Sequence, residues 1–228
     1  MYLQHANTAL FPPIMQGKSV FSGYQKIDSM RLLFFTAFLL VVGLNIAQTG
    51  AETAFSKSYA FEYDQDYTKA ITSLLNLKTD NYQIDLRLGW LYYLAKDYAK
   101  SDGYYRKAIA FENSSVEARF GLALPLSAQG NYNQVLEVYL EILSIDPNNS
   151  IANYRTASLY YNRHELNKAY TYLHMVIKLY PFDFDSNLLL GKILQAQGKT
   201  AEARKAYEKA LQYNPQSDDA KSAIKNLK

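Results

Sequence analysis

Residues 184–217 read FDSNLLLGKILQAQGKTAEARKAYEKALQYNPQS, and this segment is one copy of a pattern that recurs along the chain at a fixed step. Pro147, Pro181 and Pro215 are equally spaced, and each lies near the end of a copy. Small residues and large residues recur at the same step. The aligned sets are Gly89, Ala123, Ala157 and Gly191; Ala108, Ile142, Val176 and Ala210; and Tyr105, Tyr139, Leu173 and Tyr207. A repeat of roughly 34 residues predicts a solenoid built from stacked units.

Each copy of the pattern predicts two helices. The small residues allow two helices to approach closely, and the large residues lie three or four positions away on the same helical face. Gly130 and Gly198 suit the turn between the helices, and each Pro ends a second helix. Pro125 lies inside a predicted first helix, so we expect a kink there or a break near Leu124. The predicted helices are 52–63, 65–79, 82–95, 98–112, 115–129, 132–145, 149–162, 166–178, 184–197, 200–213 and 217–227.

The pattern resembles the tetratricopeptide repeat (TPR), a helix-turn-helix unit. The resemblance implies an all-α fold, namely a right-handed superhelical solenoid with a C-terminal capping helix. The units it implies for a TPR domain over 52–228 are a degenerate copy at 51–81, four full copies at 82–115, 116–149, 150–183 and 184–217, and a cap at 218–228. The cap is polar on most sides, as the exposed end of a solenoid requires.

An apolar run lies near the start of the chain. Leu32–Ala47 carries no charge, Arg31 precedes it, and Thr49-Gly50-Ala51 follows it with small residues. This order is typical of a secretory signal peptide over 30–51, with cleavage after Ala51. Two alternatives are an uncleaved signal anchor and a buried core helix.

The apolar run begins late for a signal peptide. Translation that starts at Met30 would explain the delay and leave 1–29 untranslated; otherwise 1–29 is an upstream segment that we expect to be disordered. With cleavage, the protein is expected to be exported, either periplasmic or secreted. Without cleavage, 32–47 anchors it in a membrane and the TPR domain lies on the non-cytoplasmic side.

The composition excludes several kinds of chemistry. There is no Cys, which excludes a thiol nucleophile, a disulfide scaffold and a zinc site with Cys ligands. His5, His164 and His174 lack carboxylates at metal-ligand spacing. No phosphate-binding loop or nucleophile elbow occurs. We therefore predict no catalytic residue, no cofactor and no metal, and a protein that is not an enzyme.

The charge argues against nucleic acid as a partner. The chain has a formal net charge of +3, and most of the excess lies in the stretch 1–51. The remainder is close to neutral, and a neutral surface is a poor binder of phosphate backbones.

The resemblance to TPR proteins implies a concave groove lined by the second, fifth, ninth and twelfth places of the first helices. In this chain many of these places hold apolar or aromatic side chains, which suit the burial of a peptide. The Lys and Asn with which some TPR domains hold a chaperone's C-terminal carboxylate are absent. The predicted groove residues are Phe55, Tyr59, Leu86, Trp90, Tyr93, Phe120, Leu124, Tyr154 and Tyr161.

These observations predict a non-catalytic protein–protein interaction scaffold that acts outside the cytosol and binds a polypeptide in the groove. The alternative is a component of an export or envelope-assembly machine that binds a glycan or polysaccharide on the rings. Self-association, with 1–29 or another copy filling the groove, is a further reading. The rings could also serve only to pack neighbouring first helices together.

Overall fold

A computed structural model describes residues 50–227. The chain divides into two compact units, Met1–Thr53 and Ala54–Lys228, and the packing and the site described below belong to the second unit. The predicted apolar run 32–47 and the upstream segment 1–29 lie outside the described residues. Within 50–227, no helix combines the length and the hydropathy that crossing a membrane requires.

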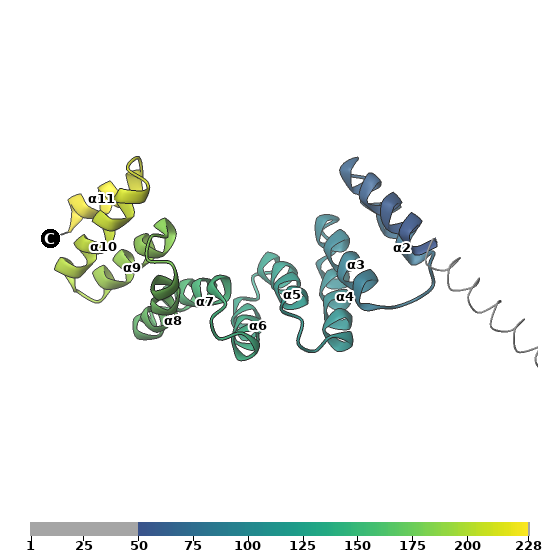
Figure 1. Cartoon of the computed structure of the whole chain (residues 1–228), viewed down its shortest axis with the longest axis horizontal. Coiled ribbons are helices and arrows are strands. Elements are labelled where there is room, and N and C mark those ends of the chain that lie inside the picture. The colour runs from purple at the N-terminus through teal and green to yellow at the C-terminus, as the bar shows by residue number, and fades with distance from the viewer. Residues whose placement is uncertain (1–49, 228) are drawn as a thin grey trace, which may run out of the picture. The chain divides into compact units, whose positions relative to one another are not determined.

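The described chain is helical throughout, with no strand among residues 50–227. All predicted helices are present, and their ends agree with the prediction within two residues except at the C-terminal end of α2. Figure 1 shows the helices following one another in sequence order. After a helical segment at 50–63 come α2 (Tyr67–Leu75), α3 (Tyr82–Leu94), α4 (Tyr98–Phe111), α5 (Val116–Ala128), α6 (Tyr132–Ile145), α7 (Ser150–Asn162), α8 (Leu166–Leu179), α9 (Phe184–Ala196), α10 (Thr200–Tyr213) and α11 (Asp218–Asn226).

The helix α2 is shorter than its sequence pattern indicates. It ends at Leu75, whereas the prediction continued to position 79. The Leu77 and Lys78 N–H groups donate to carbonyls three positions earlier, and Lys78 takes a left-handed φ of 50°. A residue in that conformation cannot continue a right-handed helix. This early end belongs to the degenerate copy, whose step from 51 to 82 is shorter than the step from 82 to 116.

The first helix of each full unit begins at a capping residue. The side chain of this residue accepts a hydrogen bond from the backbone N–H three positions later, which satisfies a donor that has no partner inside the helix. The terminal helix α11 is capped in the same way, and the capping residues recur at the step of the repeat. They are Asn81, Ser115, Asn149, Asp183 and Ser217.

The turn inside each unit also repeats its backbone conformation. Gly130 and Gly198 have φ of 75° and 76°, which confirms their assignment to the turn. The equivalent positions in the neighbouring units hold Lys96 and His164, with φ of 61° and 59°. Two full units thus place a residue with a Cβ atom in a conformation that glycine adopts at less cost, as does the degenerate copy with Gln65 at a φ of 59°.

The helix α5 contains Pro125 and runs on to Ala128. Of the two predicted outcomes, a kink at Pro125 or a break near Leu124, the break is therefore wrong. Pro125 is buried, and its carbonyl still accepts the Gln129 N–H at 3.1 Å. Pro125 has no N–H, so the helix lacks the hydrogen bond that this nitrogen would otherwise donate.

Helices that are neighbours in sequence pack against each other, and successive first helices also touch, as α3 does with α5 and α7 with α9. Buried clusters link three or four consecutive helices each, so the core runs along the stack. The helix α11 packs on α10 through the fully buried Ala220. The fold is an all-helical solenoid of helix-turn-helix units closed by a terminal helix.

Candidate functional site

A cavity of about 820 Å³ lies between first helices. It takes its lining from the helical segment 50–63, α3, α5 and α7, with two tyrosines from α4 and α6. We call it the aromatic cavity. It is lined by Phe55, Tyr59, Tyr82, Gln83, Leu86, Arg87, Trp90, Tyr105, Glu117, Phe120, Gly121, Ala123, Leu124, Ser127, Tyr139, Ile151 and Arg155.

The structure gathers most of the predicted groove residues at this cavity. Two thirds of them belong to its lining, and they come from three successive first helices. These residues are Phe55, Tyr59, Leu86, Trp90, Phe120 and Leu124.

The other three predicted residues lie elsewhere. Tyr154 lines a separate cavity of about 400 Å³ between α7 and α9. Tyr93 packs its ring between Trp90 and Tyr98, with centroids 5.8 and 5.9 Å away. Tyr161 lines neither cavity.

The sixth place of the first helices was missed by the sequence reasoning. It holds Arg87, Gly121 and Arg155, and all three line the aromatic cavity. Helical geometry explains their position, because a residue at the sixth place lies one turn after the second place and on the same face. The spacing i, i+3, i+4, i+7 from the second place would have identified it.

The floor of the cavity is a tyrosine ring covered by two glycines. Tyr105 is buried and lies between Gly89 of α3 and Gly121 of α5. A Cβ atom at Gly89 would stand 2.9 Å from Tyr105 Cγ, and one at Gly121 would stand 2.6 Å from Cζ. Burial raises the pKa of Tyr105 far above its usual range, so its ring stays neutral.

A polar cluster beside the cavity joins the helical segment 50–63 to α3. Trp90 Nε1 donates to Glu62 Oε1 at 2.8 Å, and the other carboxylate oxygen of Glu62 pairs with Arg87 Nη1. The guanidinium of Arg87 stacks on the ring of Tyr59, with Cζ 3.8 Å from the centroid. This arrangement fixes the indole and the guanidinium through a single carboxylate.

Neutral phenols supply further polar groups at the cavity. The hydroxyls of Tyr82 and Ser115 are hydrogen-bonded at 2.8 Å, and Tyr82 also donates to Glu117 Oε2 at 3.3 Å. Burial raises the pKa of Tyr82 and that of the more deeply buried Tyr139. These rings offer apolar faces and hydroxyl groups at physiological pH, but no negative charge.

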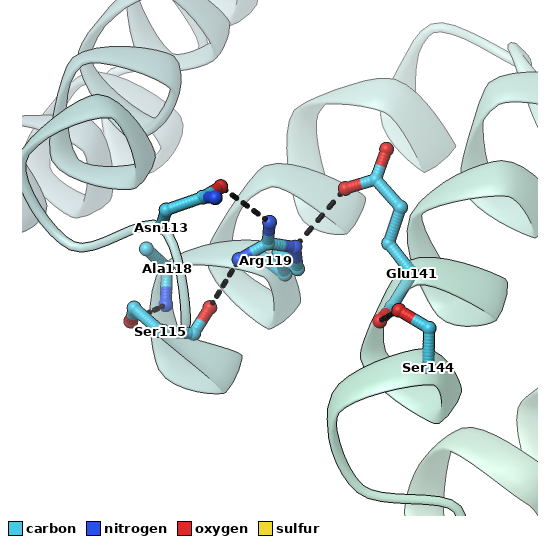
Figure 2. A network of polar contacts seen from close by, with 6 residues as sticks. All are labelled: Asn113, Ser115, Ala118, Arg119, Glu141 and Ser144. Carbon is cyan, nitrogen blue, oxygen red and sulfur yellow. Dashed lines mark hydrogen bonds and ion pairs between the residues drawn. The ribbon is translucent and has the colours of Figure 1, made fainter.

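A buried arginine holds α5, the central helix of the site, in place. Figure 2 shows Arg119 of α5 between the loop before that helix and α6. Its Nη1 donates to the Ser115 carbonyl at 3.0 Å, its Nη2 to Asn113 Oδ1 at 3.4 Å, and its Nε to Glu141 Oε2 at 3.0 Å. These contacts fix α5, whose stretch 117–127 forms one wall of the cavity, against its neighbours.

The lining residues offer recognition groups: ring faces, aliphatic side chains, hydroxyls and guanidinium groups. In the part of the chain from 50 to 227, no three His, Asp or Glu side chains gather where they could hold a metal ion. The arrangement suits the burial of an apolar ligand with a few directed polar contacts.

Two segments of the chain match a known repeat family. Models of the tetratricopeptide repeat match residues 152–183 and 185–217. The chain carries tetratricopeptide repeats over these two segments. These two matched TPR segments correspond to the copies that the sequence pattern places at 150–183 and 184–217.

The curated relatives share the repeats over part of their length. The DnaJ homolog subfamily C member 3 of Rattus norvegicus is 32% identical over 124 residues, which is 54% of this chain and 24% of that protein. The Homo sapiens protein of the same name gives the same identity and coverage. The match thus spans about a quarter of the length of these relatives.

Solved structures of other proteins share the fold. A tetratricopeptide repeat protein from Parabacteroides merdae superposes with a TM-score of 0.70 at 17% identity, over 78% of this chain and 72% of that one. MamA gives 0.64 at 18%, over 73% and 92%. YrrB, described as a TPR protein with an unusual peptide-binding site, gives 0.65 at 16%, over 83% and 98%. At these identities the likeness concerns the fold alone.

Proposed function

We propose that the protein is a non-catalytic interaction scaffold that binds a segment of a partner polypeptide in the aromatic cavity. A stack of TPR units is suited to protein–protein interaction, because stacked repeats form a continuous binding surface. The partner binds in the aromatic cavity, and binding takes place outside the cytosol. One feature carries it above the others: a cavity of about 820 Å³ lined mainly by rings and aliphatic side chains from successive first helices.

The chemistry of the lining favours a polypeptide. A peptide presents apolar side chains at regular intervals together with backbone donors and acceptors, and the lining offers partners for both. Trp90 and Arg87 are held by Glu62 before any ligand arrives, so little side-chain entropy is lost when they are used. YrrB, a protein of this fold, has a peptide-binding site.

The proposed location is outside the cytosol. Its support is the order of Arg31, the uncharged run Leu32–Ala47 and the small residues that follow, which is typical of an export signal. The mass of the mature protein tests this part directly. A species that begins near Glu52, or one that keeps 32–47 in the membrane fraction, supports export, whereas a full-length species in the cytosolic fraction contradicts it.

Site-specific crosslinking in the native host tests the binding site. A photoreactive benzophenone amino acid replaces Tyr59 or Ile151, which are exposed residues at two sides of the aromatic cavity. A matched replacement of Phe111, similarly exposed on α4 and outside the cavity, serves as the control. We expect a polypeptide adduct from positions 59 and 151 and none from 111.

Two results would count against this proposal. Adducts formed only from position 111 would place the partner on another surface. A quenching of Trp90 fluorescence by oligosaccharides, with no polypeptide adduct from either cavity position, would favour the glycan-binding alternative.

A further inference from the structure

The guanidinium of Arg87 is buried with part of its hydrogen-bonding capacity unused. Its side chain is 8% exposed, and Nη1 pairs with Glu62. Its Nε and Nη2 atoms are buried and have no hydrogen-bond partner among the described residues. Unpaired buried donors are costly, and those on a charged group more so. Such a group at the wall of a cavity indicates a ligand that supplies the missing acceptor.

The two unused atoms define the kind of acceptor. Nε and the Nη on its near side form one edge of the planar guanidinium, with two parallel N–H bonds. This edge matches the two oxygens of a carboxylate in a bidentate contact. The Glu62 carboxylate pairs with Nη1 and shares its second oxygen with Trp90, so Nε and Nη2 stay available.

A second arginine faces the same cavity from α7. Arg155 lies at the place equivalent to Arg87, two units later, and it is exposed. Within residues 50–227 it forms no ion pair. Between the two arginines the same place holds Gly121, whose missing side chain leaves the Tyr105 ring as the floor. The cavity therefore has a guanidinium on two sides of an apolar floor: that of Arg87 is paired with Glu62, that of Arg155 has no ion pair, and Glu117 is the only carboxylate among the described lining residues.

We infer that the aromatic cavity selects an acidic segment of its partner polypeptide: an Asp or Glu side chain contacts Nε and Nη2 of Arg87, Arg155 adds positive charge from the other side of the cavity, and apolar neighbours of the acid pack on the rings. This inference rests on the proposed function. Apolar neighbours are part of it because Phe55, Leu86 and Phe120 line the cavity beside the charged groups and need apolar partners to be buried.

The ring of Tyr59 has a role in access to these two atoms. It stacks on the Arg87 guanidinium at 3.8 Å and is itself 57% exposed. Because Nε and Nη2 are buried, a carboxylate reaches them only after a covering group moves, and a ring that is more than half exposed has room to turn aside. Tyr59→Ala should therefore preserve the preference for acidic peptides.

A peptide selection tests the inference. The immobilised full chain is offered a library of random dodecapeptides displayed on phage, and the recovered peptides are synthesised with amidated C-termini. We expect selected peptides to carry Asp or Glu flanked by Leu, Ile or aromatic residues. Replacing that acid by Asn or Gln should weaken binding about tenfold or more, because a charge-assisted hydrogen bond is lost.

Variants of the chain identify the arginine that responds. Arg87→Lys keeps the charge and removes the bidentate edge, and Arg155→Gln removes the second charge. Each variant should bind the acidic peptide more weakly than the wild-type chain does. Arg87→Lys should change the affinity for the Asn or Gln peptide little, because that peptide no longer has the carboxylate. Arg204→Gln, the same kind of change at an exposed site on α10 outside the cavity, should leave binding unchanged. Melting curves show which variants fold. If Arg87→Lys fails to fold, the Asn or Gln replacement in the peptide and the Arg155→Gln variant still test the inference.

The failure of this inference differs from the failure of the proposed function. Peptides that crosslink at Tyr59 or Ile151 but bind equally well after Asp→Asn overturn the inference and leave the proposed function standing. Binding that needs a free C-terminal carboxylate in place of the internal acid also overturns it. Peptides that bind without crosslinking at either position overturn both.

Discussion

The ring of Tyr105 occupies the space in which a side chain at position 121 would lie. A Cβ atom on Gly121 would stand 2.6 Å from Tyr105 Cζ, and closer still to Cε1. The ring is buried, and it also meets Gly89 of α3. This single tyrosine thus sets how closely two successive first helices approach at the floor of the aromatic cavity.

Gly121→Ala should destabilise the protein by about 1–3 kcal/mol, because the added methyl group overpacks a ring held between two helices. Gly103→Ala is the matched control, since Gly103 is an exposed residue inside α4 with nothing within 4 Å of its Cβ position. There the same change should stabilise by about 1 kcal/mol through helix propensity. Urea unfolding measures both, and equal effects of the same sign would contradict the packing argument.

Lys96→Gly and His164→Gly should each stabilise the protein by about 1 kcal/mol, because a Cβ atom is disfavoured in the left-handed region and glycine has none. The φ angles of the two residues are 61° and 59°. The reverse change, Gly198→Ala, should lower the unfolding midpoint because the equivalent φ there is 76°. A midpoint that falls on Lys96→Gly or His164→Gly would show that these side chains contribute more than their backbone strain costs.

Asp85→Asn should stabilise the protein at neutral pH by about 1–3 kcal/mol, the cost of a buried polar group without a partner. Asp85 is fully buried, and neither carboxylate oxygen has a hydrogen-bond partner among the described residues. The same place in later units holds Asn153 and Asn187, whose side-chain amides donate to loop carbonyls at 2.7–3.1 Å. An Asn at 85 would bring a donor to the equivalent loop, where Asp85 ionised brings only acceptors.

The gain in the free energy of unfolding from Asp85→Asn should depend on pH. Burial is the main cause that raises the pKa of Asp85 above its ordinary value of 3.8. Below pH 3.8 the carboxyl is protonated in both the folded and the unfolded state and costs little. As the pH rises through 3.8 towards the raised pKa, the wild-type protein loses stability and the variant does not. Asp64→Asn, at an exposed position, is the control, and a gain that is constant from pH 3 to 7 would contradict this account.

Arg119→Ala should cost about 3 kcal/mol or more, because it removes the hydrogen bonds of a buried guanidinium and leaves the Ser115 carbonyl without a side-chain donor. Glu141→Gln should cost under about 1 kcal/mol, because an exposed ion pair is screened by water. The Glu141 side chain is 56% exposed. Arg119→Asn should be milder than Arg119→Ala, because Asn153 and Asn187 reach the loop carbonyls from the same place in later units. Thermal unfolding of the three variants gives the order, and an equal loss for all three would contradict it.

The helices could be predicted because their signals are local. A capping side chain that recurs with the repeat fixes where each first helix begins, and Gly130 and Gly198 mark two of the turns. The early end of α2 could not be read in this way, since Lys78 enters the left-handed region without a glycine or proline to announce it. The break expected at Leu124 fails because packing on both sides of α5 outweighs one lost hydrogen bond.

The residues of the candidate site were harder to predict from the sequence than the helices were. Ring positions such as Trp90 and Phe120 stand out in a repeat, and the structure places both at the cavity. Arg87 did not stand out, because a lone arginine on a helix usually faces solvent. Its burial depends on tertiary contacts with the preceding first helix, the ion pair with Glu62 and the stack on Tyr59. The ring of Tyr93 packs against Tyr98 and does not line the cavity, because ring–ring contact provides an alternative packing partner.

The pairing of Glu62 with Arg87 also constrains which substitutions evolution can accept at these two positions. Loss of Glu62 alone leaves the buried guanidinium of Arg87 without its ion pair, a defect that costs several kcal/mol in proteins, and loss of Arg87 alone leaves the partly buried Glu62 carboxylate unpaired. A lineage can abandon the pair only through a double replacement or through an intermediate that tolerates the defect. Relatives should therefore keep both residues or neither. The indole of Trp90, which shares the same carboxylate, should vary together with them.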